Sequence, residues 1–253
     1  MYTFKPSDIN ENQPLFDAYI ASLAETNDDF WEEHISEAQI FRIDSSGETI
    51  GLCGIHNQEN LTFFHMPKAL LKHAQPAFLA MLEALKPQYA FVPTNDELLV
   101  SLCMDRHVKI EMQAYFFKYG GAVLRPPEYP RELLAAATPE DEADIMDKED
   151  VAENIALGKY YVMRKDGVFL GQGFFNKHAL IPGAASIGMS VHPDFRRMGV
   201  GRSIIMHLAG ICLEKGITPC CGCWYYNHNS KATLESAGFV TQTRLLKVWL
   251  NGE

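Results

Sequence analysis

Residues 186–214, SIGMSVHPDFRRMGVGRSIIMHLAGICLE, decide the fold of this chain. Ser186–Val191 predict a buried strand, and His192–Gly201 predict a turn that carries two arginines and two glycines. A helix follows, because apolar residues then recur at helical spacing and Gly216 stands just past their end. These residues are Ile204, Ile205, Leu208, Ile211 and Cys212. A strand, a glycine turn and a helix in this order predict an anion-binding site.

The chemistry of the turn favours a phosphate. Gly199 and Gly201 allow backbone N–H groups to point toward one place, where the first turn of the helix adds free N–H groups and a positive dipole end. Arg196, Arg197 and Arg202 add mobile positive charge. A Walker loop is excluded because its Gly-Lys-Ser/Thr ending is missing, and a dinucleotide fold is excluded because Ile204 stands where its third glycine belongs.

The turn Arg196-Arg197-Met198-Gly199-Val200-Gly201 matches the pattern Gln/Arg-x-x-Gly-x-Gly/Ala. With the preceding Val191-His192-Pro193, it resembles the cofactor motif of the GNAT superfamily of acyl-CoA-dependent N-acetyltransferases. Downstream, Asn227-His228-Asn229-Ser230 and then Leu234–Phe239 resemble the second signature of that family. Gly216-Ile217-Thr218-Pro219 together with Asn227–Phe239 is also similar to the zwittermicin-resistance acetyltransferase subgroup. Two signatures in the right order are more specific than either alone.

The resemblance implies acetyl-CoA as cosubstrate and a site in the carboxy-terminal half. In the family, two parallel strands splay apart, and the pantetheine arm lies in the gap against the backbone of the first strand. Ala185–Val191 and Pro219–Tyr225 are the corresponding strands here. The residues that the resemblance assigns to the cofactor are Met189, Ser190, Val191, Arg196, Arg197, Met198, Gly199, Val200, Gly201, Arg202, Ser203, Asn227 and Ser230.

The catalytic groups are less clearly marked. The family often has a carboxylate base on the cofactor strand, but this strand offers only residues such as Ser186 and Ser190. His192 is one candidate base; the alternatives are a turn role for His192 and an ordered water relay. The family's acid is a tyrosine seven residues after the signature asparagine, a position that Leu234 occupies here. Tyr225 or Tyr226 is a candidate replacement, or else packs in the structure.

Two functions remain open at this point. One is transfer of acetyl from acetyl-CoA to the primary amine of a small acceptor by direct attack, and the other is a non-catalytic acyl-CoA-binding or sensor protein. The net charge of −10 argues against a nucleic-acid partner and favours a cationic acceptor. Whether the strands of the two halves pair within one chain or across a homodimer is left open.

Composition agrees with a cytoplasmic globular protein. The chain has 253 residues, 47% of them hydrophobic, and shows neither a membrane-spanning apolar run nor the pattern of a signal peptide. The six cysteines do not form a disulfide framework, and the spacing of Cys220, Cys221 and Cys223 does not match a zinc site. We therefore expect reduced thiols, no metal and no membrane partner.

The first half repeats the element order of the second. Asn95 aligns with Asn227 and Val108 with Val240 without a gap, which indicates an internal duplication. The turn is not retained in the first copy, since Gly199 aligns with Pro67, which has no N–H to offer a phosphate. The elements expected in the first copy are helices over residues 14–23, 28–37, 67–85 and 96–104 and strands over residues 40–43, 49–55, 61–65, 89–92 and 108–117.

The sequence thus predicts an α/β (α+β) fold of tandem GNAT-like domains, each a mixed, mostly antiparallel sheet flanked by helices. Residues 1–120 are the degenerate domain, residues 121–130 a Pro- and Gly-containing linker, and residues 131–253 the acetyl-CoA-binding domain. In the second domain we expect a strand over Glu132–Ala137, a helix opened by Thr138-Pro139-Glu140-Asp141, and a hairpin of Tyr160–Arg164 with Val168–Phe175.

Overall fold

The computed structural model describes residues 1–123, 125–147 and 150–250. Within these residues the chain has a mixed α/β fold with seven α-helices and twelve strands, most of them antiparallel to their neighbours. The strand order is β1-β2-β3-β4-β5-β12-β6-β11-β10-β9-β8-β7. The chain divides into two compact units. Unit 1 contains Met1–Thr26, Phe30–Ala114 and the C-terminal segment from Thr243, and unit 2 contains Asn27–Asp29 and Tyr115–Gln242.

Unit 1 is built on the strands expected for the first copy and one more. The strand missed in the sequence is β1 (Tyr2–Ser7), which pairs antiparallel with β2. The helices are α1 (Gln13–Ser22), α2 (Asp29–Ser36), α3 (Ala74–Leu85) and α4 (Glu97–Met104). The other strands are β2 (Gln39–Ser45), β3 (Glu48–His56), β4 (Asn60–His65) and β5 (Tyr89–Pro93).

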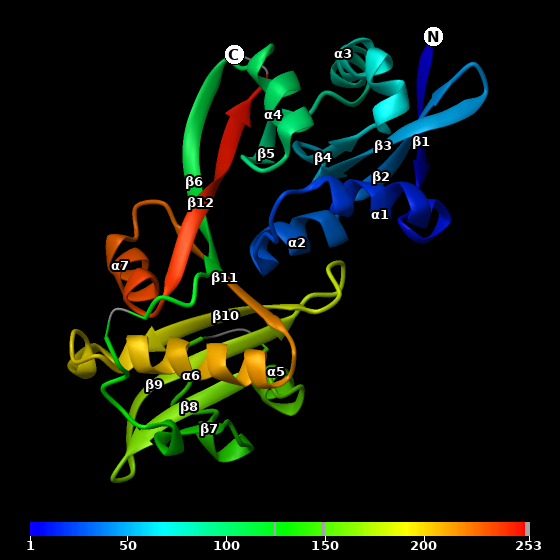
Figure 1. Cartoon of the computed structure of the whole chain (residues 1–253). Helices are drawn as coiled ribbons and strands as arrows, with labels where there is room; N and C mark the ends of the chain where they lie inside the picture. Colours follow the sequence, from blue (N-terminus) through cyan, green and yellow to red (C-terminus); the bar gives the residue numbers. More distant parts are fainter. Residues whose placement is uncertain (124, 148–149, 251–253) are drawn as a thin grey trace. The chain divides into compact units, whose positions relative to one another are not determined.

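Unit 2 repeats this order around the stretch that decides the fold. Its strands are β7 (Leu134–Ala136), β8 (Tyr160–Lys165), β9 (Val168–Lys177), β10 (Ala184–Val191) and β11 (Thr218–Trp224). Its helices are α5 (Val151–Ala156), α6 (Val200–Glu214) and α7 (His228–Ser236). Figure 1 shows α6 lying across the sheet formed by β8, β9 and β10.

Two strands run through both units. β6 (Lys109–Tyr119) begins in unit 1 and neighbours β11 in unit 2. β12 (Phe239–Trp249) begins in unit 2, and its Leu245–Trp249 pair antiparallel with β5 in unit 1. The halves therefore pair strands within the chain, and the compact units depart from the division 1–120 and 131–253 at these two strands.

Three expected elements differ in detail. Instead of one helix over residues 67–85, a 3-10 helix over Lys68–His73 precedes α3, because Pro76 fits only in the first turn of an α-helix. The strand expected over Glu132–Ala137 is shortened to β7 by a 3-10 turn over Arg131–Leu133. The helix expected from Thr138 is a single 3-10 turn, closed by a reciprocal capping box between Thr138 and Asp141.

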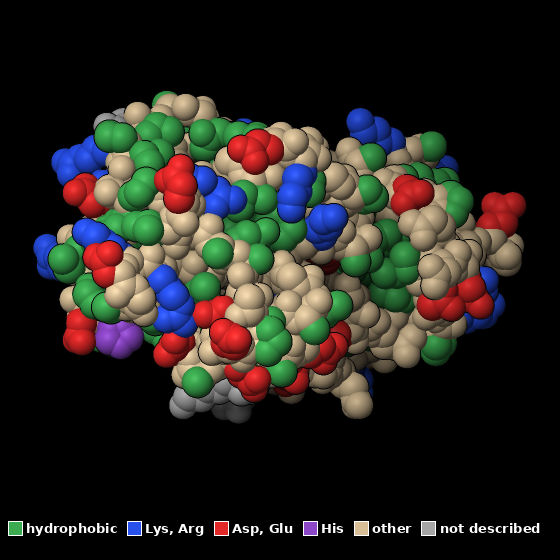
Figure 2. All heavy atoms as spheres, turned by 90° about the horizontal axis from the view of Figure 1, so that it is seen from below, with side chains coloured by type: hydrophobic (Ala, Val, Ile, Leu, Met, Phe, Trp, Pro, Cys, Tyr) green, Lys and Arg blue, Asp and Glu red, His purple; other side chains and the backbone are tan. Residues whose placement is uncertain are grey.

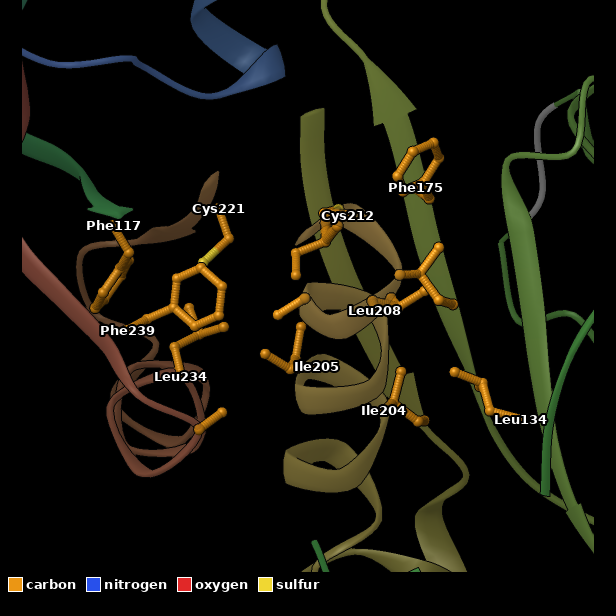
Figure 3. Close-up of a cluster of buried hydrophobic side chains, with 14 of the residues drawn as sticks. Phe117, Leu134, Phe175, Ile204, Ile205, Leu208, Cys212, Cys221, Leu234 and Phe239 are labelled. Carbon is orange, nitrogen blue, oxygen red and sulfur yellow. The ribbon is translucent and has the colours of Figure 1, made fainter. Parts of the chain in front are cut away.

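The core of unit 2 lies between α6 and the strands. The predicted apolar stripe of α6 is buried, with Ile204, Ile205, Leu208 and Cys212 each at 0% exposure. Figure 3 shows these side chains pointing between Leu134 and Phe175 on one side and a second group on the other. That second group consists of Phe117, Cys221, Leu234 and Phe239. Burial of this stripe fixes α6, and with it the turn that precedes the helix.

The cysteines are free, and charged side chains are spread over the surface. All six cysteines are free thiols, and five of them are buried. Figure 2 shows acidic and basic side chains distributed over the same face among hydrophobic ones. None of the helices in the described part of the chain is long and apolar enough to cross a membrane.

Candidate functional site

The strands β10 and β11 splay apart as predicted. They run parallel, but only Ala184, Ala185 and Ser186 of β10 are in register with β11, opposite Thr218–Cys220. On its other side, β10 pairs with β9 along its whole length to Val191. Beyond Ser186, the edge of β10 that faces β11 therefore has no strand partner among the described residues, and its backbone groups are available to a ligand.

The turn between β10 and α6 has the geometry that its glycines suggested. Gly199 is the N-cap of α6 and takes a φ of 82°, which a residue with a side chain rarely adopts. Arg197, which is not a glycine, also takes a positive φ of 65°. Non-glycine residues are held in this region mainly where the local structure requires it, and they cluster at ligand sites. The first hydrogen bond of the helix joins Ser203 N–H to Gly199 O at 3.0 Å, so the N–H groups before Ser203 remain to bind an anion.

A cavity of about 860 Å³ connects the turn with the splayed strand. Eleven of the thirteen predicted cofactor residues line its wall: Met189, Ser190, Val191, Arg196, Arg197, Gly199, Val200, Gly201, Arg202, Asn227 and Ser230. The other two lie elsewhere. Met198 is 52% exposed on the turn, and Ser203 is fully buried, where its hydroxyl donates to Gly199 O and accepts from Tyr129 N–H, each at 3.0 Å.

The three arginines of the cavity differ in exposure and in their contacts. Arg196 and Arg197 are exposed, and Arg196 Nε donates to Val191 O at 3.4 Å. Arg202 is more enclosed and forms an ion pair with Glu128, 3.6 Å from its guanidinium nitrogen. Glu128 also lies directly against Gly199, since a Cβ built on this glycine would stand 2.7 Å from Glu128 Cβ. The segment around Glu128 thus forms one side of the turn.

The three candidate catalytic residues are not among the described residues that line the cavity. His192 Nδ1 accepts a hydrogen bond from Asp194 N–H at 3.4 Å, and its ring contacts Phe195, which is the local turn role considered above. Tyr225 stacks on Tyr115 with ring centres 4.7 Å apart. Tyr226 is 55% exposed and contacts Trp224 edge-on.

One wall of the cavity comes from α7. Asn227 caps this helix, with its side-chain Oδ1 accepting from Ser230 N–H at 3.1 Å, so that the signature asparagine has a structural task. Four further residues of α7 line the cavity and were not predicted: Asn229, Ala232, Thr233 and Ser236. Their spacing of three and four residues marks one helix face made of small and polar side chains, which is a signal that the sequence did contain.

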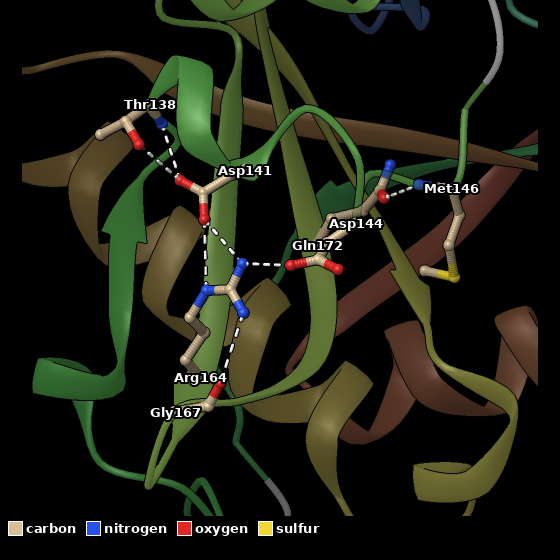
Figure 4. A network of polar contacts seen from close by, with 7 residues as sticks. All are labelled: Thr138, Asp141, Asp144, Met146, Arg164, Gly167 and Gln172. Atoms are coloured by element: carbon tan, nitrogen blue, oxygen red, sulfur yellow. Dashed lines mark hydrogen bonds and ion pairs between the residues drawn. The ribbon is translucent and has the colours of Figure 1, made fainter.

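The other unpredicted part of the wall is Met146 and Asp147, from the segment between β7 and α5. Figure 4 shows the contacts that hold this segment. Arg164 of β8 binds Asp141 and Asp144, while Met146 N–H donates to Gln172 of β9 at 2.6 Å. Burial would raise the pKa of Asp141, but its hydrogen bonds from Thr138 and Arg164 outweigh burial and lower the pKa. No helical or strand periodicity marks this segment, so its place at the site could not be read from the sequence.

Comparison with protein families assigns both halves. The acetyltransferase (GNAT) domain family matches residues 8–120, and the acetyltransferase (GNAT) family matches residues 127–239. The two matches together cover most of the chain, and they support the duplication inferred from the element order. The search of curated proteins gave no significant match.

Solved structures show the same fold over the whole chain. A GNAT-family acetyltransferase from Colwellia psychrerythraea aligns with a TM-score of 0.88 at 16% identity, over 98% of this chain and 100% of the other. A tandem GNAT protein from the clavulanic acid biosynthesis pathway aligns with a TM-score of 0.62 at 12% identity, over 100% of both chains. A GCN5-related N-acetyltransferase from Sphaerobacter thermophilus also gives 0.62, at 11% identity, over 100% of this chain and 97% of the other. The chain belongs to the GNAT superfamily of acetyltransferases and is a tandem of two GNAT domains.

Proposed function

We propose that unit 2 binds acetyl-CoA and transfers its acetyl group to the primary amine of a small cationic acceptor. The observation that carries this proposal is the single cavity that joins an anion-binding turn to the unpaired edge of β10. Acetyl-CoA has a pyrophosphate at one end and a thioester at the other, and an extended pantetheine arm with amide groups between them. A ligand of this kind requires both parts of the cavity.

The residues present fit the two ends of this ligand. At the turn, Gly199 and the first N–H groups of α6 provide donors for the pyrophosphate, and Arg196 and Arg197 provide positive charge. Along Met189–Val191, the free backbone groups of β10 can bond to the pantetheine amides and orient the thioester carbonyl. A backbone N–H directed at that carbonyl oxygen would also stabilise the negative charge that develops on it during attack.

The net charge of −10 supports a cationic acceptor, because a negative protein attracts and concentrates amines that carry a positive charge. The acceptor must enter the cavity away from the arginines of the turn, which would repel it. Met146 and Asp147 belong to a different segment from the turn, and Asp147 adds a negative charge to the cavity wall.

The experiment has two steps. Calorimetry with acetyl-CoA tests the binding site, and we expect one molecule bound per chain. Release of free CoA is then followed with a thiol reagent in the presence of ethylamine, ethanolamine, diaminobutane or lysine. Binding without CoA release from any amine would instead favour a non-catalytic acyl-CoA-binding protein, and no binding would exclude both functions.

A further inference from the structure

Asp147 is the single carboxylate among the described residues that line the cavity. It belongs to the segment between β7 and α5, far in sequence from the glycine turn and from β10. All the charged groups elsewhere in the described wall are arginines, namely Arg196, Arg197 and Arg202. The cavity therefore combines one negative group with a positive phosphate-binding end.

Two neutral donors fix the carboxylate of Asp147. Tyr160 Oη and Gln172 Nε2 both donate to its Oδ2 at 2.8 Å. Gln172 is only 2% exposed, and its Oε1 accepts from Met146 N–H, so one buried amide holds two successive residues of the segment. Burial, and then the bond to Asp147, raise the pKa of Tyr160, which keeps the phenol protonated as a donor. Oδ1 of Asp147 receives no hydrogen bond from the described residues and is available to a ligand.

The same contacts place Asp147 beside the free edge of β10. Gln172 of β9 is the cross-strand partner of Ser190, which lines the cavity between Met189 and Val191. Residues opposite each other in an antiparallel pair project to the same face of the sheet, so Gln172 and Ser190 share a face. Gly171 and Gly173 face α6 instead, because a Cβ on either glycine would meet Ile204. Asp147 is thus held on the face opposite α6, over the part of β10 assigned to the thioester.

The other carboxylates of this segment are not placed to bind a cation in the cavity. Asp141 and Asp144 both bind Arg164, and neither lines the cavity in the described part of the chain. Asp147 has no cationic partner among the described residues and contacts only neutral donors. A carboxylate held in this way keeps its affinity for a cation that enters the cavity.

We propose that Asp147 binds the ammonium group of the acceptor and takes one of its protons, with Gln172 and Tyr160 as positioning residues. This inference rests on the proposed acetyl transfer. Proton transfer to the Asp147 carboxylate gives a neutral amine, whose lone pair forms the new C–N bond at the thioester carbonyl. The C–S bond then breaks, the nitrogen loses a second proton, and the thiolate takes up one, so that CoA, the amide and one proton are released. The base lost from the cofactor strand is thereby supplied from the segment before α5.

The decisive variant is Asp147→Asn. Its amide oxygen can still accept from Tyr160 and Gln172, so the segment should keep its place while the base is lost. General-base catalysis is typically worth a hundredfold to ten-thousandfold, and we expect kcat for CoA release at neutral pH to fall by about a hundredfold or more. Acetyl-CoA affinity by calorimetry should stay within about twofold, because the binding turn is unchanged.

Three further measurements separate a chemical role from a structural one. The deficit of Asp147→Asn should narrow as the pH rises, since solution then supplies the neutral amine. Asp147→Glu should retain more activity than Asp147→Asn, because it keeps a carboxylate. Tyr160→Phe removes one positioning hydrogen bond and should lower kcat by about tenfold, with acetyl-CoA affinity kept. Glu153→Gln, which changes an exposed carboxylate of α5 outside the described cavity wall, is the matched control and should behave as wild type.

The outcomes distinguish this inference from the proposed function. A wild-type protein that releases CoA, together with an Asp147→Asn variant within about threefold of its kcat at neutral pH, would overturn the role of Asp147 alone. The same holds if the deficit is independent of pH. A wild-type protein that releases no CoA with any amine of the panel would overturn the proposed transfer and this inference with it.

Discussion

Each unit contains a pair of parallel strands that separate after a short paired stretch, β4 and β5 in unit 1 and β10 and β11 in unit 2. The two pairs differ in the side chains that lie beside them. In unit 1, β4 and β5 run parallel with only Asn60 and Leu61 in register, opposite Tyr89 and Ala90. In unit 2, β10 and β11 are paired over three residues before they separate. Both units have thus kept the short parallel pairing of these two strands.

Side chains occupy the space near the first strand pair. Tyr19 of α1 is 1% exposed and stacks on Phe63 of β4, with ring centres 4.9 Å apart. Burial raises the pKa of Tyr19, and the nearby Asp96 carboxylate at the start of α4 raises it further. Tyr19 therefore reaches from β4 to the residues that follow β5.

The turns differ as well. After β4, Pro67 leads into a 3-10 helix, and α3 begins only at Ala74. After β10, Gly199 at positive φ leads directly into α6. The two turns therefore present different backbone N–H groups at the start of the following helix, and under the proposed function only the turn of unit 2 would bind a phosphate. This difference also allows unit 1 to be used as an internal control for unit 2.

The largest expected effect is loss of acetyl-CoA binding in a Gly199→Pro, Gly201→Pro double variant. Proline removes two N–H groups at the start of α6, and a side chain at Gly199 would also clash with Glu128. Hydrogen bonds to charged groups are worth about 1.5 to 3 kcal/mol each, so calorimetry should show at least a hundredfold loss of affinity.

Two controls accompany this variant. Gly210→Ala changes a glycine of the same helix whose Cβ would meet nothing within 4 Å, and it should leave affinity unchanged. Pro67→Gly with Ala69→Gly should not create a second site in unit 1. Unchanged affinity in the double proline variant, or two molecules bound per wild-type chain, would contradict the assignment.

The next prediction compares the helices behind the two strand pairs. Leu208 of α6 and Met81 of α3 are both fully buried, and truncation of either to alanine should cost about 2 to 5 kcal/mol of unfolding free energy. Only Leu208→Ala should also weaken acetyl-CoA binding, by several-fold, because α6 carries the turn. Denaturant unfolding and calorimetry measure the two effects, with Leu213→Ala, at a 50% exposed position of α6, as the control. Equal loss of affinity in both core variants would mean that unit 1 shapes the site directly.

These two tests also show what the sequence could predict. The glycine turn and the buried stripe of α6 followed from local patterns, because turn chemistry and helical period depend on neighbouring residues. The splayed pair was expected only from the resemblance to the family. Asp147 did not follow from such patterns, because its place depends on Gln172 and Tyr160, which are distant in sequence and carry no motif. The same applies to Tyr19, whose contact with Phe63 joins an ordinary amphipathic helix to an ordinary buried strand.

A smaller effect is expected from the buried carboxylate of unit 1. Burial raises the pKa of Asp96 to about 6 in the folded protein, above the usual value near 3.9 in an unfolded chain. The folded state then binds more protons between these values, so stability falls as the pH rises from about 4 to about 6. Asp96→Asn should remove this dependence and stabilise the protein at pH 7 by roughly 1 to 3 kcal/mol.

Asparagine is suited to this test because it can still cap α4 as Asp96 does, where Oδ1 accepts from Leu99 N–H at 3.0 Å. Urea unfolding of both proteins at pH 4 and pH 7 measures the difference. Acetyl-CoA affinity should not change, since the substitution lies in unit 1. Parallel pH profiles for wild type and variant would show that Asp96 is not the group responsible.

The smallest effects are expected at the two tyrosines considered as donors to the CoA thiolate. Tyr225 is stacked on Tyr115, and Tyr226 is more than half exposed beside Trp224, so neither lines the described part of the cavity. Phenylalanine at either position keeps the packing and removes only the hydroxyl. We expect kcat for CoA release to stay within about threefold, with acetyl-CoA affinity unchanged, because a true general acid would be worth about a hundredfold or more. A hundredfold loss in one variant alone would identify that tyrosine as the acid. It would also show that the end of β11 comes close to the thioester when the substrates bind.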